Sequence, residues 1–241
     1  MKVLLVEADY KNKYPPLGLM KISAYHKQVG DVVTFVKGKN RELRSQKWDR
    51  IYITTLFTFY WKKTVDTIRY YYSSVDHPKN IHVGGIMATL LADDLKKEEG
   101  ISGITIRIGL LDCPNMLGTE TIPVDRMTPD YDIIDARKNP YLQYEYQLQD
   151  SYITSATKGC IRNCGFCAVK KLEPEYCAYI DIRSQVEEIN QKYGERRNLV
   201  LMDNNILASP CLGQIINDLI VLGFERGNYG YKKNLKKEQV I

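Results

Sequence analysis

Gly159-Cys160-Ile161-Arg162-Asn163-Cys164-Gly165-Phe166-Cys167 is the stretch on which the interpretation of the fold depends. Its three cysteines have the spacing C-x3-C-x2-C, and it follows a run of strand-forming residues at 152–156. Three thiolates on one tight loop can bind three irons of a four-iron cluster, which leaves the fourth iron open to another ligand. We expect the two glycines to relieve backbone crowding in this loop. The stretch therefore predicts a metal centre at the carboxyl end of a β-strand.

The residues that follow this loop alternate between helix and strand patterns. A helix is predicted at 183–193, a strand at 198–202 and a helix at 212–222. This order is typical of parallel α/β folds, so residues 151–241 are expected to begin a second α/β domain. They number 91, whereas a six-unit (β/α) barrel needs ~180 at roughly 30 residues per unit. We therefore expect only part of such a barrel.

The N-terminal part of the sequence interleaves short β-branched runs with amphipathic helical stretches. Strands are predicted at 3–7, 32–36, 50–54, 81–83 and 104–111, and helices at 17–29, 61–73 and 88–99. This alternation predicts a Rossmann-like, doubly wound parallel sheet. The residues expected at its carboxyl edge, where such sheets bind ligands, are Glu7, Asp9, Thr54, Thr55, Gly84 and Gly85.

Residues 112–150 break the pattern with four prolines and scattered acidic and tyrosine residues. The predicted organisation is therefore a domain at 1–111, a linker at 112–150 and a second domain at 151–241.

Composition excludes several classes of protein. The apolar fraction of 44% is too high for a disordered chain, and the apolar runs are too short for the ~20 residues of a membrane span. The net charge is +5, and residues 225–241 contain five basic and two acidic residues. Because this excess is concentrated in a polar tail, nucleic-acid binding is not expected unless RNA is a substrate. We expect a cytosolic protein; the sequence gives no indication of its oligomeric state.

The cysteine loop resembles the motif of the radical S-adenosylmethionine (SAM) enzymes. In that family C-x3-C-x-aromatic-C follows the first barrel strand, and Phe166 occupies the aromatic position here. The resemblance implies that Cys160, Cys164 and Cys167 hold a [4Fe-4S] cluster whose fourth iron chelates SAM. It further implies an external electron donor, a 5′-deoxyadenosyl radical that abstracts hydrogen from an unidentified substrate, and a position for Phe166 near the adenine.

A second family feature is a Gly-Gly-Glu-like run at the end of the second barrel strand. The matching position here reads Leu201-Met202-Asp203-Asn204-Asn205, without the glycines or the glutamate. Asp203 and Asn204 are the residues at this strand end that we expect to contact SAM, since catalytic barrels use these ends. Equally, both could cap the turn into the next helix.

The N-terminal domain resembles the cobalamin-binding-type domain that precedes the barrel in one subgroup of that family. The matching residues are Tyr14-Pro15-Pro16-Leu17-Gly18-Leu19 and Val83-Gly84-Gly85-Ile86-Met87-Ala88-Thr89. The Gly-Gly turn suits either a ligand or helix packing. The histidine motif Asp-x-His-x-x-Gly is missing after the first strand, so cobalamin is doubtful and would bind without a protein ligand.

Other interpretations of the cysteines remain open. Cys177 could be the fourth ligand of a structural zinc or closed iron–sulfur site, although its distance from Cys167 is unusual for zinc. Otherwise Cys113, Cys177 and Cys211 are reduced structural thiols. A relative that binds a cluster without catalysis, or a truncated one, is the competing functional class.

Overall fold

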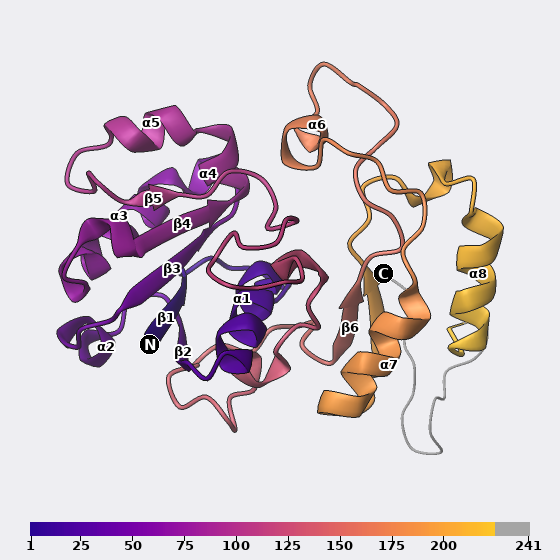
Figure 1. Ribbon diagram of the computed structural model, residues 1–241, viewed down its shortest axis with the longest axis horizontal. Helices are drawn as coiled ribbons and strands as arrows, with labels where there is room; N and C mark the ends of the chain where they lie inside the picture. Colours follow the sequence, from indigo (N-terminus) through magenta and orange to yellow (C-terminus); the bar gives the residue numbers. More distant parts are fainter. Residues whose placement is uncertain (225–241) are drawn as a thin grey trace. The chain divides into compact units, whose positions relative to one another are not determined.

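The computed structural model describes residues 1–224 and has the α/β fold expected from the sequence (Figure 1). It divides into two compact units, Met1–Tyr146 and a second one that begins at Gln147. The basic tail singled out in the sequence lies outside the described residues. No helix in the described part is both long and apolar enough to cross a membrane.

The first unit contains a sheet of five parallel strands in the order β2-β1-β3-β4-β5. The strands are β1 (Lys2–Glu7), β2 (Val32–Lys37), β3 (Arg50–Thr55), β4 (Ile81–Gly85) and β5 (Thr105–Ile106). The order reverses between β1 and β3, which is where doubly wound sheets bind ligands. The predicted Rossmann-like sheet is confirmed, and Glu7, Thr55 and Gly85 end their strands at one edge of it.

Helices cover both faces of this sheet (Figure 1). They are α1 (Leu17–Gln28), α2 (Arg41–Ser45), α3 (Trp61–Tyr71), α4 (Ile86–Leu90) and α5 (Ala92–Lys97). The helix predicted at 88–99 is instead two short ones, because Leu91 lies outside the helical region at φ −121°. Sequence reasoning also missed α2, a short helix whose Asn40 cap accepts a hydrogen bond from the Leu43 amide at 3.0 Å.

The strands of this sheet are buried on both faces. Leu4 and Val6 of β1 belong to a core that includes Val65 and Ile68 of α3. Because side chains alternate along a strand, Leu5 points to the other face, the one covered by α1. Near-continuous apolar runs such as residues 3–6 are what a sheet buried in this way requires.

Most of the segment expected as a linker, residues 112–146, belongs to the first compact unit. It has short 3₁₀ turns at Val124–Arg126 and Tyr131–Ile134, and several of its apolar side chains are buried. Asp130 holds it to α1, because its amide donates to the Met20 carbonyl at 3.0 Å and its carboxylate accepts from Ser23 at 2.6 Å.

The described part of the second unit, residues 147–224, contains two parallel strands and three α-helices. They are β6 (Ser151–Thr154), α6 (Val169–Leu172), α7 (Ile182–Tyr193), β7 (Asn198–Leu201) and α8 (Leu212–Val221). The carboxylate of Asp181 caps α7 by accepting from the amides of Arg183 at 2.9 Å and Ser184 at 3.2 Å. Two successive strand–helix units of this kind are the pattern with which a (β/α) barrel begins.

Candidate metal centre

The three cysteines of the loop after β6 line one cavity of about 270 Å³. The loop after β7 contributes Asn204 and Asn205 to the same cavity. Because β6 and β7 are parallel neighbours, their carboxyl ends lie at the same edge, and the two loops meet there. Cys160, Cys164 and Cys167 thus line one cavity, and their ligation of a cluster stays a prediction.

The cysteine loop is closed at its base by backbone hydrogen bonds. Lys158 and Cys177 form an antiparallel bridge, in which each amide donates to the other's carbonyl at 3.1 and 3.0 Å. Gly159, the next residue, has φ +66°, and a Cβ there would overlap the carbonyl oxygen of Glu175. Gly159 therefore relieves crowding as expected. The same expectation was wrong for Gly165, around which a Cβ would meet open space.

Glu173 connects the two loops that form the cavity. Its Oε2 accepts from the Gly159 amide at 2.7 Å and from Asn204 Nδ2 at 2.8 Å. The first bond fixes the start of the cysteine loop, and the second fixes the end of β7. Sequence reasoning missed Glu173, since a glutamate between lysines and a proline has no distinctive spacing.

The thiol of Cys160 is the one with identified hydrogen-bond donors. Its Sγ accepts from the Arg162 amide at 3.4 Å and from Asn205 Nδ2 at 3.3 Å. These donors favour the thiolate and lower the pKa of Cys160. Asn205 was not predicted; the signal was an amide side chain next to Asn204 at a strand end.

Cys164 and Cys167 are exposed and stand at the two ends of a turn, in which the Cys167 amide donates to the Cys164 carbonyl at 3.0 Å. The Phe166 ring between them is 96% exposed. Its expected contact with an adenine stays a prediction.

Among residues 1–224, no three His, Cys, Asp or Glu side chains converge on a position for one metal ion. A cubane cluster does not require such convergence, because each thiolate binds a different iron. Tetrahedral zinc does require it, with all ligands within ~2.3 Å of one ion. Cys177 is not among the residues that line the cavity, and its thiol donates to the Tyr179 carbonyl at 3.2 Å. A fourth ligand at Cys177 therefore finds no support in this arrangement.

Asp203 holds the carboxyl ends of β6 and β7 together. Both of its carboxylate oxygens accept from the Ala156 amide at 3.1 Å, and one also accepts from the amide and hydroxyl of Thr157. The alternative that Asp203 and Asn204 cap the next helical turn is wrong, because Asn205 stands at that N-cap and makes no side-chain bond there. Contact of Asp203 or Asn204 with SAM stays a prediction.

A second cavity, of about 190 Å³, lies in the first unit between α1 and the ends of β3 and β4. It is lined mostly by apolar side chains and includes the Gly84–Gly85 turn. Gly85 has φ +106°, and a Cβ there would overlap the Thr55 carbonyl oxygen. The Thr55 hydroxyl accepts from the Ala88 amide at 3.0 Å, so the turn serves the packing of α4 on the sheet and also borders a cavity.

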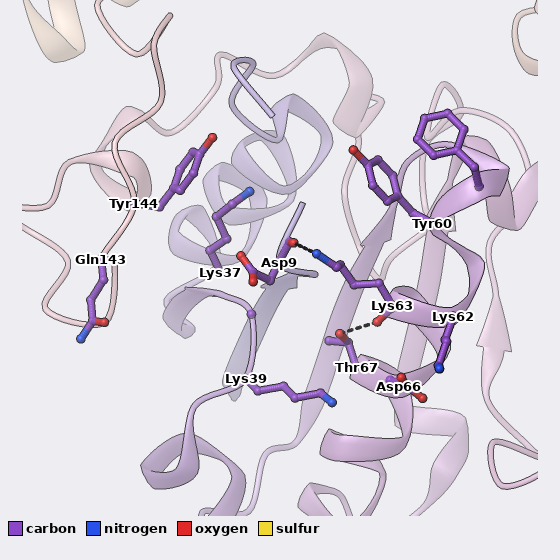
Figure 2. A pocket seen from close by; sticks show the side chains of 12 residues that line it. Asp9, Lys37, Lys39, Tyr60, Lys62, Lys63, Asp66, Thr67, Gln143 and Tyr144 are labelled. Carbon is purple, nitrogen blue, oxygen red and sulfur yellow. Dashed lines mark hydrogen bonds between the residues drawn. The ribbon is translucent and has the colours of Figure 1, made fainter. Parts of the chain in front are cut away.

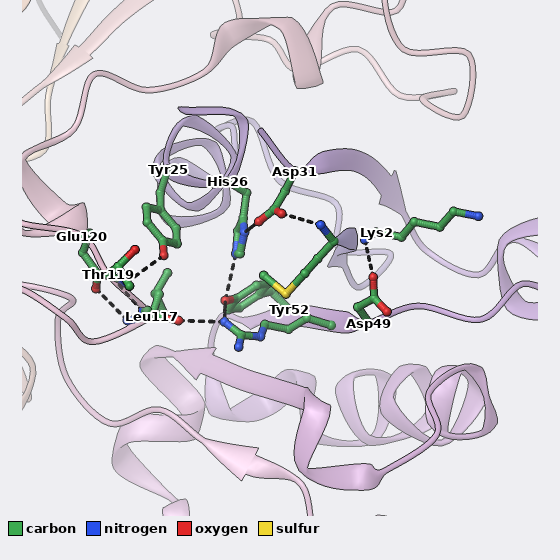
Figure 3. Close-up of polar contacts among 12 residues, drawn as sticks. Lys2, Tyr25, His26, Asp31, Asp49, Tyr52, Leu117, Thr119 and Glu120 are labelled. Carbon is green, nitrogen blue, oxygen red and sulfur yellow. Dashed lines mark hydrogen bonds and ion pairs between the residues drawn. The ribbon is translucent and has the colours of Figure 1, made fainter. Parts of the chain in front are cut away.

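One of the three histidines of the sequence, His82, lines this cavity. His82 is buried in β4, and its Nδ1 accepts from Arg107 Nε at 3.2 Å; burial and the nearby charges lower the pKa of His82 to about 3. Both ring nitrogens of His26 are engaged, with Asp31 at 2.7 Å and Tyr52 at 3.0 Å (Figure 3). His77 is exposed before β4, away from the carboxyl edge.

Neither the protein-family models nor the curated protein sequences contain a match to this chain. A solved structure is similar: the radical SAM methyltransferase TsrM from Kitasatospora setae, with its tryptophan substrate and a SAM analogue bound. The TM-score is 0.51 at 13% sequence identity, and the match covers 94% of this chain and 52% of the other. The chain thus spans about half the length of that protein. At this identity, what the similarity shows is a shared α/β fold.

Proposed function

We propose that this chain is a radical SAM protein, in which Cys160, Cys164 and Cys167 hold a [4Fe-4S] cluster that binds SAM at its open iron. The observation that carries the proposal is the single cavity lined by all three thiols at the carboxyl end of β6. The donor set fits the group, because three thiolates leave one iron free. The fold shared with a radical SAM methyltransferase is consistent with it.

The roles of the chain's own residues follow from their contacts. Asn205 donates to the Cys160 sulfur, while Glu173 fixes the loop on which the thiols lie. Asn204 and Phe166 are the residues proposed to contact SAM. Asp203 holds the carboxyl ends of β6 and β7 together, and it is also proposed to contact SAM. When bound, the cluster would pass an electron from an external donor to SAM, whose reductive cleavage yields a 5′-deoxyadenosyl radical.

All six cysteines of the chain are free thiols. Clustered reduced thiols are typical of reducing compartments, so the proposal includes a cytosolic location. The substrate acted on by the radical is unidentified, and the tryptophan of the similar structure belongs to that protein.

Anaerobic reconstitution with iron and sulfide tests the proposal. We expect close to four irons per chain, an EPR signal after dithionite that changes on addition of SAM, and formation of 5′-deoxyadenosine. The Cys164→Ser variant should lose the cluster. Cys113→Ser and Cys211→Ser, which change cysteines outside the loop, should keep it.

Two results would replace the proposal with its competitors. A full iron load without 5′-deoxyadenosine would identify a non-catalytic cluster-binding relative. A zinc-loaded, EPR-silent protein that loses its metal in Cys177→Ser would identify a structural four-cysteine site.

Cobalamin has a separate test. Because both ring nitrogens of His26 are hydrogen-bonded and His82 Nδ1 accepts from Arg107, we expect that a corrinoid would bind without a protein ligand. Incubation with hydroxocobalamin followed by desalting decides this. A retained red chromophore would establish corrinoid binding, and a colourless protein would exclude it.

A further inference from the structure

A third cavity, of about 810 Å³, lies at the carboxyl edge of the five-stranded sheet, beside the ends of β1 and β2 and the first turns of α3 (Figure 2). It shares no lining residue with the cavity of the three cysteines or with the second cavity, which lies between α1 and the ends of β3 and β4. Its volume is in the range of cavities that hold small-molecule ligands, and it borders the switch between β1 and β3. None of the roles proposed above uses it.

The rim of this cavity is positively charged. Lys39 follows β2, while Lys62 and Lys63 stand in the first turn of α3. That turn has no acidic residue and no side-chain cap, although acidic residues are the ones that a helix dipole favours there. The two lysines and the positive end of the α3 dipole therefore add their potential at one place, which favours an anion there.

The floor of the cavity is a buried ion pair rather than a free charge. The Lys37 side chain is 2% exposed, and its ammonium lies 2.8 Å from Glu7 Oε2. The ring of Tyr144 covers the same ammonium at 4.4 Å from its centroid. Because Glu7 compensates Lys37, the three lysines of the rim provide the attraction for an anion, and Lys37 fixes Tyr144 in place.

Two carboxylates, Asp9 and Asp66, and aromatic rings also line the cavity. Asp9 follows β1 directly, and its backbone carbonyl accepts from Lys63 Nζ at 2.5 Å, which places its exposed carboxylate beside the lysines (Figure 2). Tyr60 and Tyr144 stand at opposite sides of the cavity in that view. Phe59, 73% exposed, packs on Tyr60 with ring centroids 4.6 Å apart. An exposed aromatic pair beside lysines provides a surface on which a planar base can stack.

We propose that this cavity binds a nucleoside diphosphate or a related nucleotide. Lys39, Lys62 and Lys63 bind its phosphates, the Asp9 carboxylate accepts from the ribose hydroxyls, and the base stacks on Phe59 and Tyr60. Of the two acids that line the cavity, Asp9 is thus given a role in binding, whereas Asp66 lies 3.7 Å from Arg69 Nη1. The site is independent of the cysteine loop, so its test does not depend on the proposed radical chemistry.

Isothermal titration of the full chain with ADP, pyrophosphate and adenosine tests the site. We expect one ADP per chain and at least tenfold weaker binding of pyrophosphate and of adenosine, because each has only part of the contacts. The double variant Lys62→Gln/Lys63→Gln should weaken ADP binding at least tenfold. Lys79→Gln/Lys97→Gln, which removes the same charge from exposed positions elsewhere on the unit, should leave it unchanged.

The exposed positions Asp9 and Phe59 separate a nucleotide site from a general anion site. Asp9→Asn and Phe59→Ala should each weaken ADP binding several-fold while the thermal unfolding midpoint stays the same. Pyrophosphate binding as tight as that of ADP, unaffected by either variant, would overturn the nucleotide assignment. Absence of saturable ADP binding up to millimolar concentration would overturn the site. Tighter binding of a single-stranded RNA oligomer at the same lysines would overturn it in favour of a nucleic-acid surface.

Discussion

Asn205 forms a side-chain hydrogen bond to one of the candidate cluster ligands. Its amide donates to the Cys160 sulfur at 3.3 Å, and this bond contributes to the lowered pKa of that thiol. In Asn205→Ala the thiolate loses a donor, so we expect the pKa of Cys160 to rise towards its ordinary value. The pKa of Cys160 can be measured in the metal-free protein from the rate at which iodoacetamide alkylates this thiol at different pH values. Peptide mass spectrometry follows the alkylation.

Asn204→Ala is the matched control for that measurement. The Asn204 amide donates to Glu173, and no bond joins it to the Cys160 sulfur. Its alkylation profile should therefore stay close to that of the unaltered protein. A profile that shifts equally in both variants would show that loop order, rather than the hydrogen bond, sets the pKa.

The two glycines of the cysteine loop should respond differently to the same substitution. Gly159→Ala places a Cβ on the Glu175 carbonyl at φ +66°, so we expect a loss of about 1–3 kcal/mol and reduced iron binding. Gly165→Ala meets no atom within 4 Å and should leave both properties nearly unchanged. Urea unfolding and iron content after reconstitution check this; equal effects of the two variants would contradict the geometry described.

At the scale of elements, the junction of β4 and α4 depends on one backbone conformation. Gly85→Ala introduces a side chain at φ +106° against the Thr55 carbonyl, which should cost about 2–5 kcal/mol. Gly18 lies in α1 with open space around it, so Gly18→Ala should instead stabilise the protein by about 0.5 kcal/mol. Urea unfolding should show a lower free energy of unfolding for Gly85→Ala and a higher one for Gly18→Ala. A lower value for both variants would contradict this expectation.

The elements show how far periodicity alone predicts this fold. The β-branched runs predicted β1 to β4 within a few residues, because strands buried on both faces leave a continuous apolar signal. The strand predicted at 104–111 is only Thr105–Ile106, since the chain turns away at Gly109 with φ +75°. The helix predicted at 88–99 breaks at Leu91, a residue that no helix-stop rule identifies.

Some residues of the candidate site could be predicted from the sequence, and others could not. The cysteines were predictable because covalent spacing along one loop determines which thiols share a cavity. Glu173 and Asn205 were not, because their roles depend on how two loops meet across β6 and β7. The third cavity, with Lys39, Lys62 and Lys63 at its rim, was also missed. Lys39 and Lys63 lie far apart in sequence and come together only through the strand order.

At the scale of the whole molecule, two buried histidines should make stability depend on pH. Burial lowers the pKa of His26 and brings that of His82 to about 3, whereas both titrate near 6.5 when unfolded. Below pH 6.5 the unfolded chain therefore binds more protons, and stability falls by up to about 1.4 kcal/mol per pH unit for each histidine. Burial raises the pKa of Glu7, which offsets part of this loss at lower pH.

Urea unfolding at pH 7, 6 and 5 measures the effect, and His82→Asn identifies the share of one histidine. We expect the unaltered protein to lose stability over this range and the variant to lose less. A stability that is constant from pH 7 to pH 5 would contradict the buried, neutral state of His82.

The bridge between Lys158 and Cys177 has a consequence for how the proposed cluster would be assembled and repaired. The neck of the cysteine loop is closed by the two backbone bonds of this bridge and by the bond from the Gly159 amide to the Glu173 carboxylate. In the proposed cluster protein, iron would therefore be added to a loop whose neck is held by protein groups and whose two outer thiols, Cys164 and Cys167, are exposed. Such a cluster would be exchangeable after damage by oxygen while the strands on either side of the loop stay folded.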